Sequence, residues 1–183
     1  MTVKECIITA ATELGIVNEV QAYLEGTSTD GKKNAELLLA CFNLVENELA
    51  LDYLPLYAED EMRSDTGKIE FSTLSMSAVR ILRVSDEWGN SVRFQLFPTY
   101  LKTQPGTVRV AYTYTPEQKA LTGESDFKLQ ASVRLMAYGM AAEYTLATGL
   151  FEEHAVWDKK YKESIAAAYK ARPCRKMRSR RWA

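Results

Sequence analysis

The periodicity of the apolar residues changes twice along the chain, and this change limits the fold more than any other feature. Residues 1–62 and 117–172 space their apolar side chains three or four positions apart, as amphipathic helices do. Residues 63–116 contain short runs in which apolar and polar residues alternate, which is typical of half-buried antiparallel strands. A parallel sheet would need strands and helices in alternation. We therefore predict an α+β fold, a predominantly helical bundle with an inserted antiparallel β-module.

The N-terminal helices carry recognisable start and stop signals. Thr2 and Glu5 have the spacing of a capping box, which predicts a helix over residues 2–14. A second start signal predicts a short helix over residues 18–24, and a longer one begins near residue 32. Pro55 ends that longer helix, because proline disfavours helical geometry in the residue before it.

The β-module is punctuated by turn residues. Asp86-Glu87-Trp88-Gly89-Asn90 has the composition of a hairpin loop, and Pro105-Gly106 marks a second turn. The acidic run Glu59-Asp60-Glu61 ahead of the module is expected to be a solvated loop rather than a metal site. Alternation predicts strands at residues 69–71, 79–81, 92–96 and 108–114.

Helical spacing returns after Pro116. Ser125 or Asp126 is expected to cap a helix that ends at Gly149, and a last helix is predicted over residues 151–171. Residues 173–183 are too polar and too basic to pack on their own. We expect them to form an extended tail that orders only on a partner.

Charge is distributed unevenly along the chain. The formal net charge is −1, from 23 basic and 24 acidic residues, but residues 170–183 hold seven basic residues and no acidic one. Removing those seven leaves 16 basic against 24 acidic residues, so the body of the protein carries about −8. An acidic body does not favour binding of nucleic acid or an anionic membrane.

The basic tail has three readings. It could be a docking peptide, a solvated terminus, or a nucleic-acid grip whose affinity falls steeply with salt. We favour docking, because arginine forks suit carboxylates and an indole at position 182 has no local core to bury it. The predicted docking residues are Arg175, Lys176, Arg178, Arg180, Arg181 and Trp182. Trp88, in its hairpin loop, is predicted to be a further partner-interface residue.

Residues that could carry catalysis are few. The only histidine, His154, is read as a helix-surface residue, and no nucleophile, phosphate-loop or dinucleotide motif is present. Glu46, Glu48 and Asp52 could pair as acid and base, but a solvated or interface-facing helix edge is the favoured reading. The sequence predicts no enzymatic activity.

Metal, cofactor and membrane sites are also not predicted. Cys6, Cys41 and Cys174 lack metal-ligand spacing, and the first two lie on apolar helix faces as small core residues. No cofactor is expected. No signal sequence and no apolar run long enough to cross a membrane is found, so folding in a reducing cytosol is expected.

Five runs of the sequence carry a likeness to a known family: Asp52-Tyr53-Leu54-Pro55-Leu56, residues 137–144, residues 149–153, Trp157-Asp158-Lys159-Lys160-Tyr161 and Arg178-Ser179-Arg180-Arg181-Trp182. These runs resemble head–tail connector (adaptor, or head-completion) proteins of tailed bacteriophages. The likeness covers nearly the whole chain and is diffuse, because that family has no catalytic motif.

This resemblance implies a structural protein of the virion neck, made in the cytoplasm of a bacterial host. Neighbouring adaptor subunits would form a ring, typically dodecameric, beneath the portal protein, and DNA would pass through its lumen without specific binding. The C-terminal tail would dock on the portal, and the β-module would face a neighbour or a tail or gatekeeper protein. The segments would be helices at 1–62 and 117–172, the β-module at 63–116 and the docking tail at 173–183. The alternative function is a small nucleic-acid-binding protein that uses its basic tail.

Overall fold

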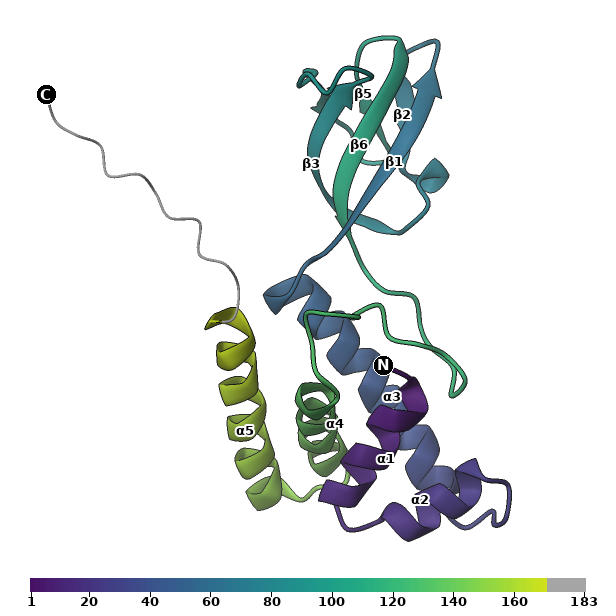
Figure 1. Ribbon diagram of the computed structural model, residues 1–183, viewed down its shortest axis with the longest axis vertical. Helices are drawn as coiled ribbons and strands as arrows, with labels where there is room; N and C mark the ends of the chain where they lie inside the picture. Colours follow the sequence, from purple (N-terminus) through teal and green to yellow (C-terminus); the bar gives the residue numbers. More distant parts are fainter. Residues whose placement is uncertain (171–183) are drawn as a thin grey trace, which may run out of the picture. The chain divides into compact units, whose positions relative to one another are not determined.

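The computed structural model describes residues 1–170. In this part of the chain three α-helices come first, the strands of two small antiparallel sheets come next, and two more α-helices follow (Figure 1). Helices make up 46% and strands 22%, which confirms the predicted α+β class. The chain forms two compact units, and each is described by itself. The strand unit comprises Met1–Lys4 and Phe42–Lys128, and the helical unit comprises Glu5–Cys41 and the described residues from Leu129 to Lys170.

The N-terminal helices agree with the sequence periodicity. Cys6, Ile7 and Ala10 are fully buried on one face of the first helix, so the small thiol fills core space as expected. The turn after this helix needs a left-handed residue, and Gly15 supplies it with φ of 74°. The three helices are α1 (Val3–Glu13), α2 (Val17–Leu24) and α3 (Lys32–Glu48), and a π-helical turn (Leu49–Tyr53) follows before Pro55.

The C-terminal helices are α4 (Val133–Ala147) and α5 (Phe151–Lys170). The N-cap of α4 is Ser132, whose hydroxyl oxygen accepts a hydrogen bond from Leu135 N at 3.2 Å. The predicted cap at Ser125 or Asp126 is therefore wrong. The Ser125 hydroxyl is already committed, since it donates to the buried Glu46 carboxylate at 2.6 Å.

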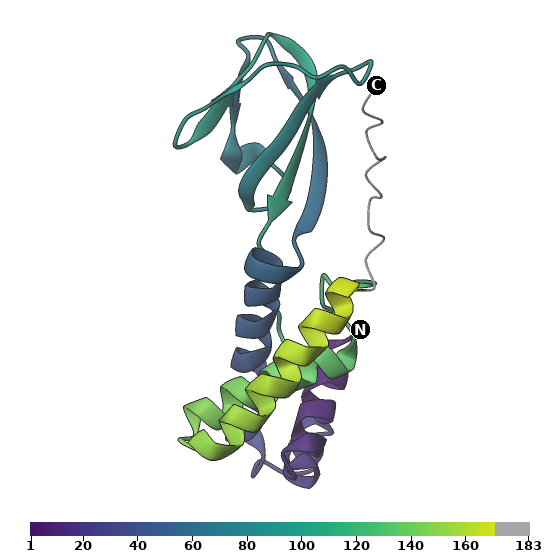
Figure 2. The ribbon, with the colours of Figure 1, turned by 90° about the vertical axis from the view of Figure 1, so that its left-hand side faces the viewer.

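Helices α4 and α5 pack against each other in the helical unit (Figure 2). Helix α4 is buried over most of its surface because its residues are small or apolar, including Ala137, Ala141 and Ala142. Aromatic contacts join the two helices, with the rings of Tyr138 and Trp157 5.9 Å apart between centroids.

Six strands build the strand unit. The larger sheet has the order β1-β6-β3 and the smaller one β2-β5-β4, and every pairing is antiparallel. The apolar core of the unit includes Ile69, Val84, Leu101, Val110 and Tyr112. The strands are β1 (Leu56–Ser64), β2 (Lys68–Glu70), β3 (Ala78–Asp86), β4 (Gln95–Leu96), β5 (Tyr100–Lys102) and β6 (Gly106–Tyr114).

The expectation of a solvated loop at Glu59-Asp60-Glu61 is wrong, because these residues lie in β1. Burial alternates along this strand, so Glu59 and Glu61 are exposed while Asp60 lies between them on the inner face. The inward carboxylate is tolerated because three donors meet it at 2.7 Å: the Tyr112 hydroxyl, the Ser75 hydroxyl and Ser75 N. Three consecutive acidic residues hide the strand periodicity from a reading of hydropathy alone.

Candidate interaction surfaces

Trp88 is held in an exposed position by a well-organised hairpin loop between β3 and β4. Its side chain is 82% exposed, as predicted for an interface residue. One carboxylate oxygen of Asp86 accepts hydrogen bonds from Trp88 N at 3.0 Å and Asn90 N at 2.7 Å, and Gly89 turns the chain with φ of 83°. The loop therefore displays a large apolar ring without local cover.

Asp86 is fixed as an anion by this loop. Its other oxygen accepts a hydrogen bond from the Asn90 side-chain amide at 3.0 Å. That bond, together with the backbone N–H groups of the loop, lowers the pKa of Asp86 despite some desolvation. The hydrogen bonds of the loop therefore favour the ionised form of Asp86.

The six predicted docking residues, Arg175, Lys176, Arg178, Arg180, Arg181 and Trp182, lie outside the described residues, as does Cys174. The structure consequently brings only Trp88 of the predicted site residues onto a described surface.

Helix α3 anchors the long connection between β6 and α4 through two polar side chains. The side-chain Nδ2 of Asn43 donates a hydrogen bond to the backbone carbonyl of Lys119 at 3.1 Å. The side-chain Oδ1 of Asn43 accepts one from Lys119 N at 2.7 Å. One turn later, one oxygen of Glu46 accepts from the Ser125 hydroxyl at 2.6 Å and from Asp126 N at 2.9 Å. These bonds tie a segment without helix or strand to the helix.

Glu46 is the most unusual carboxyl group of this anchor. It is 1% exposed, and its second oxygen has no hydrogen-bond partner among the described residues. Burial raises its pKa, against the lowering effects of the Ser125 hydroxyl, Asp126 N–H and the charge of Lys119. Lys119 forms an ion pair with Asp126 at 2.8 Å.

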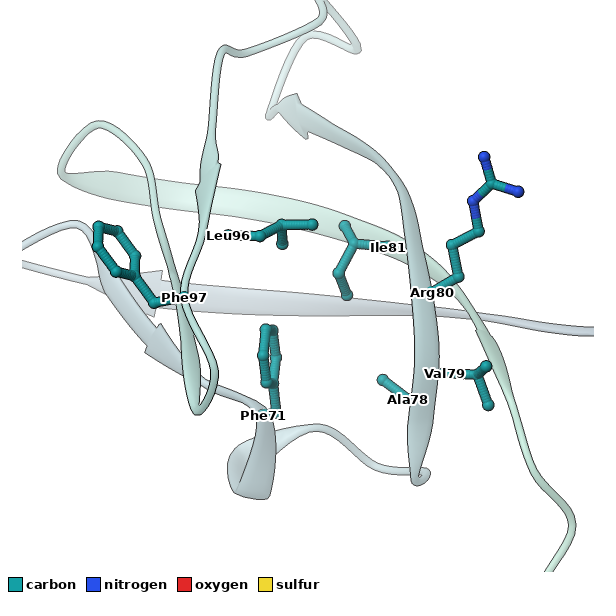
Figure 3. A pocket seen from close by; sticks show the side chains of 7 residues that line it. All are labelled: Phe71, Ala78, Val79, Arg80, Ile81, Leu96 and Phe97. Carbon is teal, nitrogen blue, oxygen red and sulfur yellow. The ribbon is translucent and has the colours of Figure 1, made fainter.

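An apolar cavity of about 210 Å³ opens between β3 and β4. Figure 3 shows Phe71, Ile81 and Leu96 directed into it, whereas Val79 and Arg80 point away to the other side of β3. This volume is below the usual range of small-molecule pockets, about 300–1,000 Å³, and no set of polar groups converges on it. It has the size and chemistry to take one apolar side chain.

The carboxylates considered for catalysis differ in exposure, because Glu46 is buried, Glu48 is half-buried and Asp52 is exposed. Glu46 and Asp52 therefore do not face one surface. His154 Nδ1 lies 2.9 Å from the Ala142 carbonyl, to which it donates, joining α5 to α4. Burial raises the pKa of Cys41 to about 12, so its thiol is a core group and a poor nucleophile at neutral pH.

The described residues contain neither a cluster of metal-ligating side chains nor a helix that could span a membrane. Among residues 1–170 no group of three or more histidine, cysteine, aspartate or glutamate side chains could hold a metal ion. In the same part of the chain, no helix combines the length and apolar character needed to span a bilayer.

The sequence reasoning missed Asn43 as an anchoring residue. Asn43 interrupts the largely apolar middle of α3, which is the signal that could have marked it, but nothing local reveals that its partner lies 76 residues away. Comparisons with protein-family models and with curated protein sequences find no match.

Proposed function

We propose that this protein is a structural interaction protein, a head–tail adaptor of a tailed phage that joins portal to tail. The observation that carries the proposal is Trp88, a largely exposed indole held on an ordered hairpin, because tryptophan is enriched where binding energy concentrates. The uneven charge supports it, since an acidic body of about −8 lets a passing duplex slide.

In this proposal the finer architecture is a helical bundle with the β-module inserted and an extended C-terminal tail. The tail docks on the portal, and the subunits form a ring, typically dodecameric, in the virion neck after synthesis in the host cytoplasm. DNA passes through the lumen, and the β-module contacts a neighbour or a tail or gatekeeper protein. The resemblance of the sequence runs supports each of these points.

The test is attachment to a portal. Full-length protein and a variant lacking residues 174–183 are mixed with a candidate portal and followed by sedimentation and electron microscopy. We expect the truncated protein to keep its circular dichroism spectrum and to lose attachment. Attachment equal to that of the full chain would overturn the docking role.

Trp88→Ala tests the hairpin separately. We expect a loss of roughly 30-fold or more in affinity for the tail-side partner or for ring formation, in line with the cost of removing an interface tryptophan. Leu129→Ala is the matched control, because Leu129 is 98% exposed and has no assigned role. Equal behaviour of both variants would remove Trp88 from the interface.

The alternative is a small nucleic-acid-binding protein, favoured by the seven basic residues among residues 170–183. It predicts duplex binding at about 50 mM salt that weakens steeply by about 200 mM. Absence of binding at the lower salt concentration would eliminate it.

A further inference from the structure

The outer face of the larger sheet carries opposite charges at its two edges. Antiparallel register aligns residues of the three strands in rows across this face. The rows are Tyr57–Thr113–Arg80, Glu59–Ala111–Arg83 and Glu61–Arg109–Ser85, written from β1 through β6 to β3. Strand β1 therefore contributes two carboxylates, and strand β3 contributes two guanidinium groups.

Exposed apolar side chains accompany these charges at both edges. On the β1 edge, Tyr57 is 62% exposed. On the β3 edge, Val79 is 52% and Leu82 44% exposed. The exposed residues of β1 also include Arg63 at its far end, and Glu61 is ion-paired with Arg109 at 3.2 Å. Within the described residues, Glu59 beside Tyr57 is therefore the unpaired acidic group of the β1 edge, and it is complementary to Arg80 and Arg83 on the β3 edge.

Both strands are edges of their sheet, because the order is β1-β6-β3. Within residues 1–170, β1 makes no backbone-to-backbone hydrogen bond outside its ladder with β6, and the same holds for residues 78–83 of β3. The register of β3 shifts at Val79 and Leu82, which disfavours a regular new ladder on this side. Side chains, rather than a continuous ladder, would therefore make a contact here.

We propose that the β3 edge of one copy contacts the β1 edge of the next copy of this chain. Strands β1 and β3 run in the same direction, since both are antiparallel to β6. Copies aligned row to row would place Arg83 beside Glu59 of the next copy, with Arg80 beside its Tyr57.

The contact is head-to-tail. Pairing two β3 edges would oppose guanidinium groups, which disfavours that like pairing, whereas the Glu59 carboxylate of β1 matches the charge of the β3 edge. A head-to-tail contact between identical copies produces a ring or an open filament. The inference deepens the proposed adaptor and rests on it for its biological setting, because it names the surface that joins neighbouring subunits.

The test is a charge swap in the full-length chain. Glu59 and Arg80 are suited to it, because both are exposed and neither forms a hydrogen bond or ion pair with the part of the chain that the structure describes. They occupy adjacent rows, at a diagonal distance that long side chains bridge. Self-association is measured by sedimentation velocity from about 1 to 300 µM in about 50 mM salt.

We expect the wild type to associate, and Glu59→Arg or Arg80→Glu alone to weaken association about tenfold, because each places two side chains of like charge next to each other in the contact. An equimolar mixture of the two variants should regain association, since each supplies the edge that the other lacks. Glu13→Arg, a reversal at the end of α1 in the helical unit, should leave association unchanged.

Three results would overturn the contact: a wild type that stays monomeric throughout the concentration range, single variants that associate like the wild type, or a mixture that does not recover. Association of the wild type only with a different, acidic protein would show that the β3 edge serves another partner. No portal is present in these measurements. Loss of self-association with intact portal attachment would therefore refute the edge contact and leave the adaptor proposal standing. Self-association that behaves as expected, together with no portal attachment, would refute the adaptor proposal and leave the edge contact standing.

Discussion

The anchor between α3 and the connection from β6 to α4 gives a sharp test of how this segment is held. Asn43→Ala removes two hydrogen bonds, one to the Lys119 carbonyl at 3.1 Å and one from Lys119 N at 2.7 Å. The Glu46 bonds one turn further along α3 remain in the variant. The substitution therefore isolates one of two attachment points.

The magnitude follows from those two bonds. Each contributes about 1 kcal/mol net, and the part-buried peptide group of Lys119 loses its partner, so the segment should open about 2–3 kcal/mol more easily. A difference of this size corresponds to a roughly 30- to 150-fold larger open population.

Amide hydrogen exchange measures this directly. Exchange in residues 117–126 should accelerate by about that factor, while the core strand β6 changes less. Asn34→Ala is the control, because Asn34 also lies on α3 but accepts its hydrogen bond from Tyr144 in the helical unit. Unchanged exchange in residues 117–126, or equal acceleration in the control, would refute the assignment of the anchor to Asn43.

Three further substitutions test buried and crowded positions. The raised pKa of Glu46 makes its ionisation unfavourable in the folded state, so the Glu46→Gln variant should gain stability relative to the wild type as pH rises above 4.5. The gain is at most about 1.4 kcal/mol per pH unit. Urea titrations at pH 4.5 to about 8 measure it, and a constant difference in the free energy of unfolding would contradict the prediction. Asp60→Asn should show the opposite trend, because the hydrogen bonds to the Asp60 carboxylate outweigh the effect of burial and lower its pKa. The wild type should therefore be more stable than the variant above pH 3.8 and should lose this advantage as pH falls further. The same urea titrations, extended to about pH 2, would detect the loss. Gly31→Ala should destabilise the helical unit by about 2 kcal/mol or more, since a Cβ there would lie 2.0 Å from the backbone carbonyl oxygen of Glu19; a melting temperature within 1 °C of wild type would show that the backbone yields easily.

The helical segments and turns were predictable because their signals are local. Gly15 takes a positive φ, Pro55 follows the end of the π-helical turn, and the Asp86–Asn90 loop forms as its composition indicates. Cys6 and Cys41 are buried on apolar faces for the same reason, since a spacing of three or four residues is visible within a short window. The charge split of the chain also follows from the sequence alone.

Only the tertiary structure decided the location of β1, the anchor and the two charged sheet edges. Glu59 to Glu61 form a strand because β6, about 50 residues later, supplies the ladder, and Tyr112 supplies a donor for Asp60. Ser125 leaves its expected cap because Glu46, 79 residues earlier, takes its hydroxyl. Long-range pairing selects among conformations that are locally similar in energy, and hydropathy along the chain carries no record of which distant segment will be the partner.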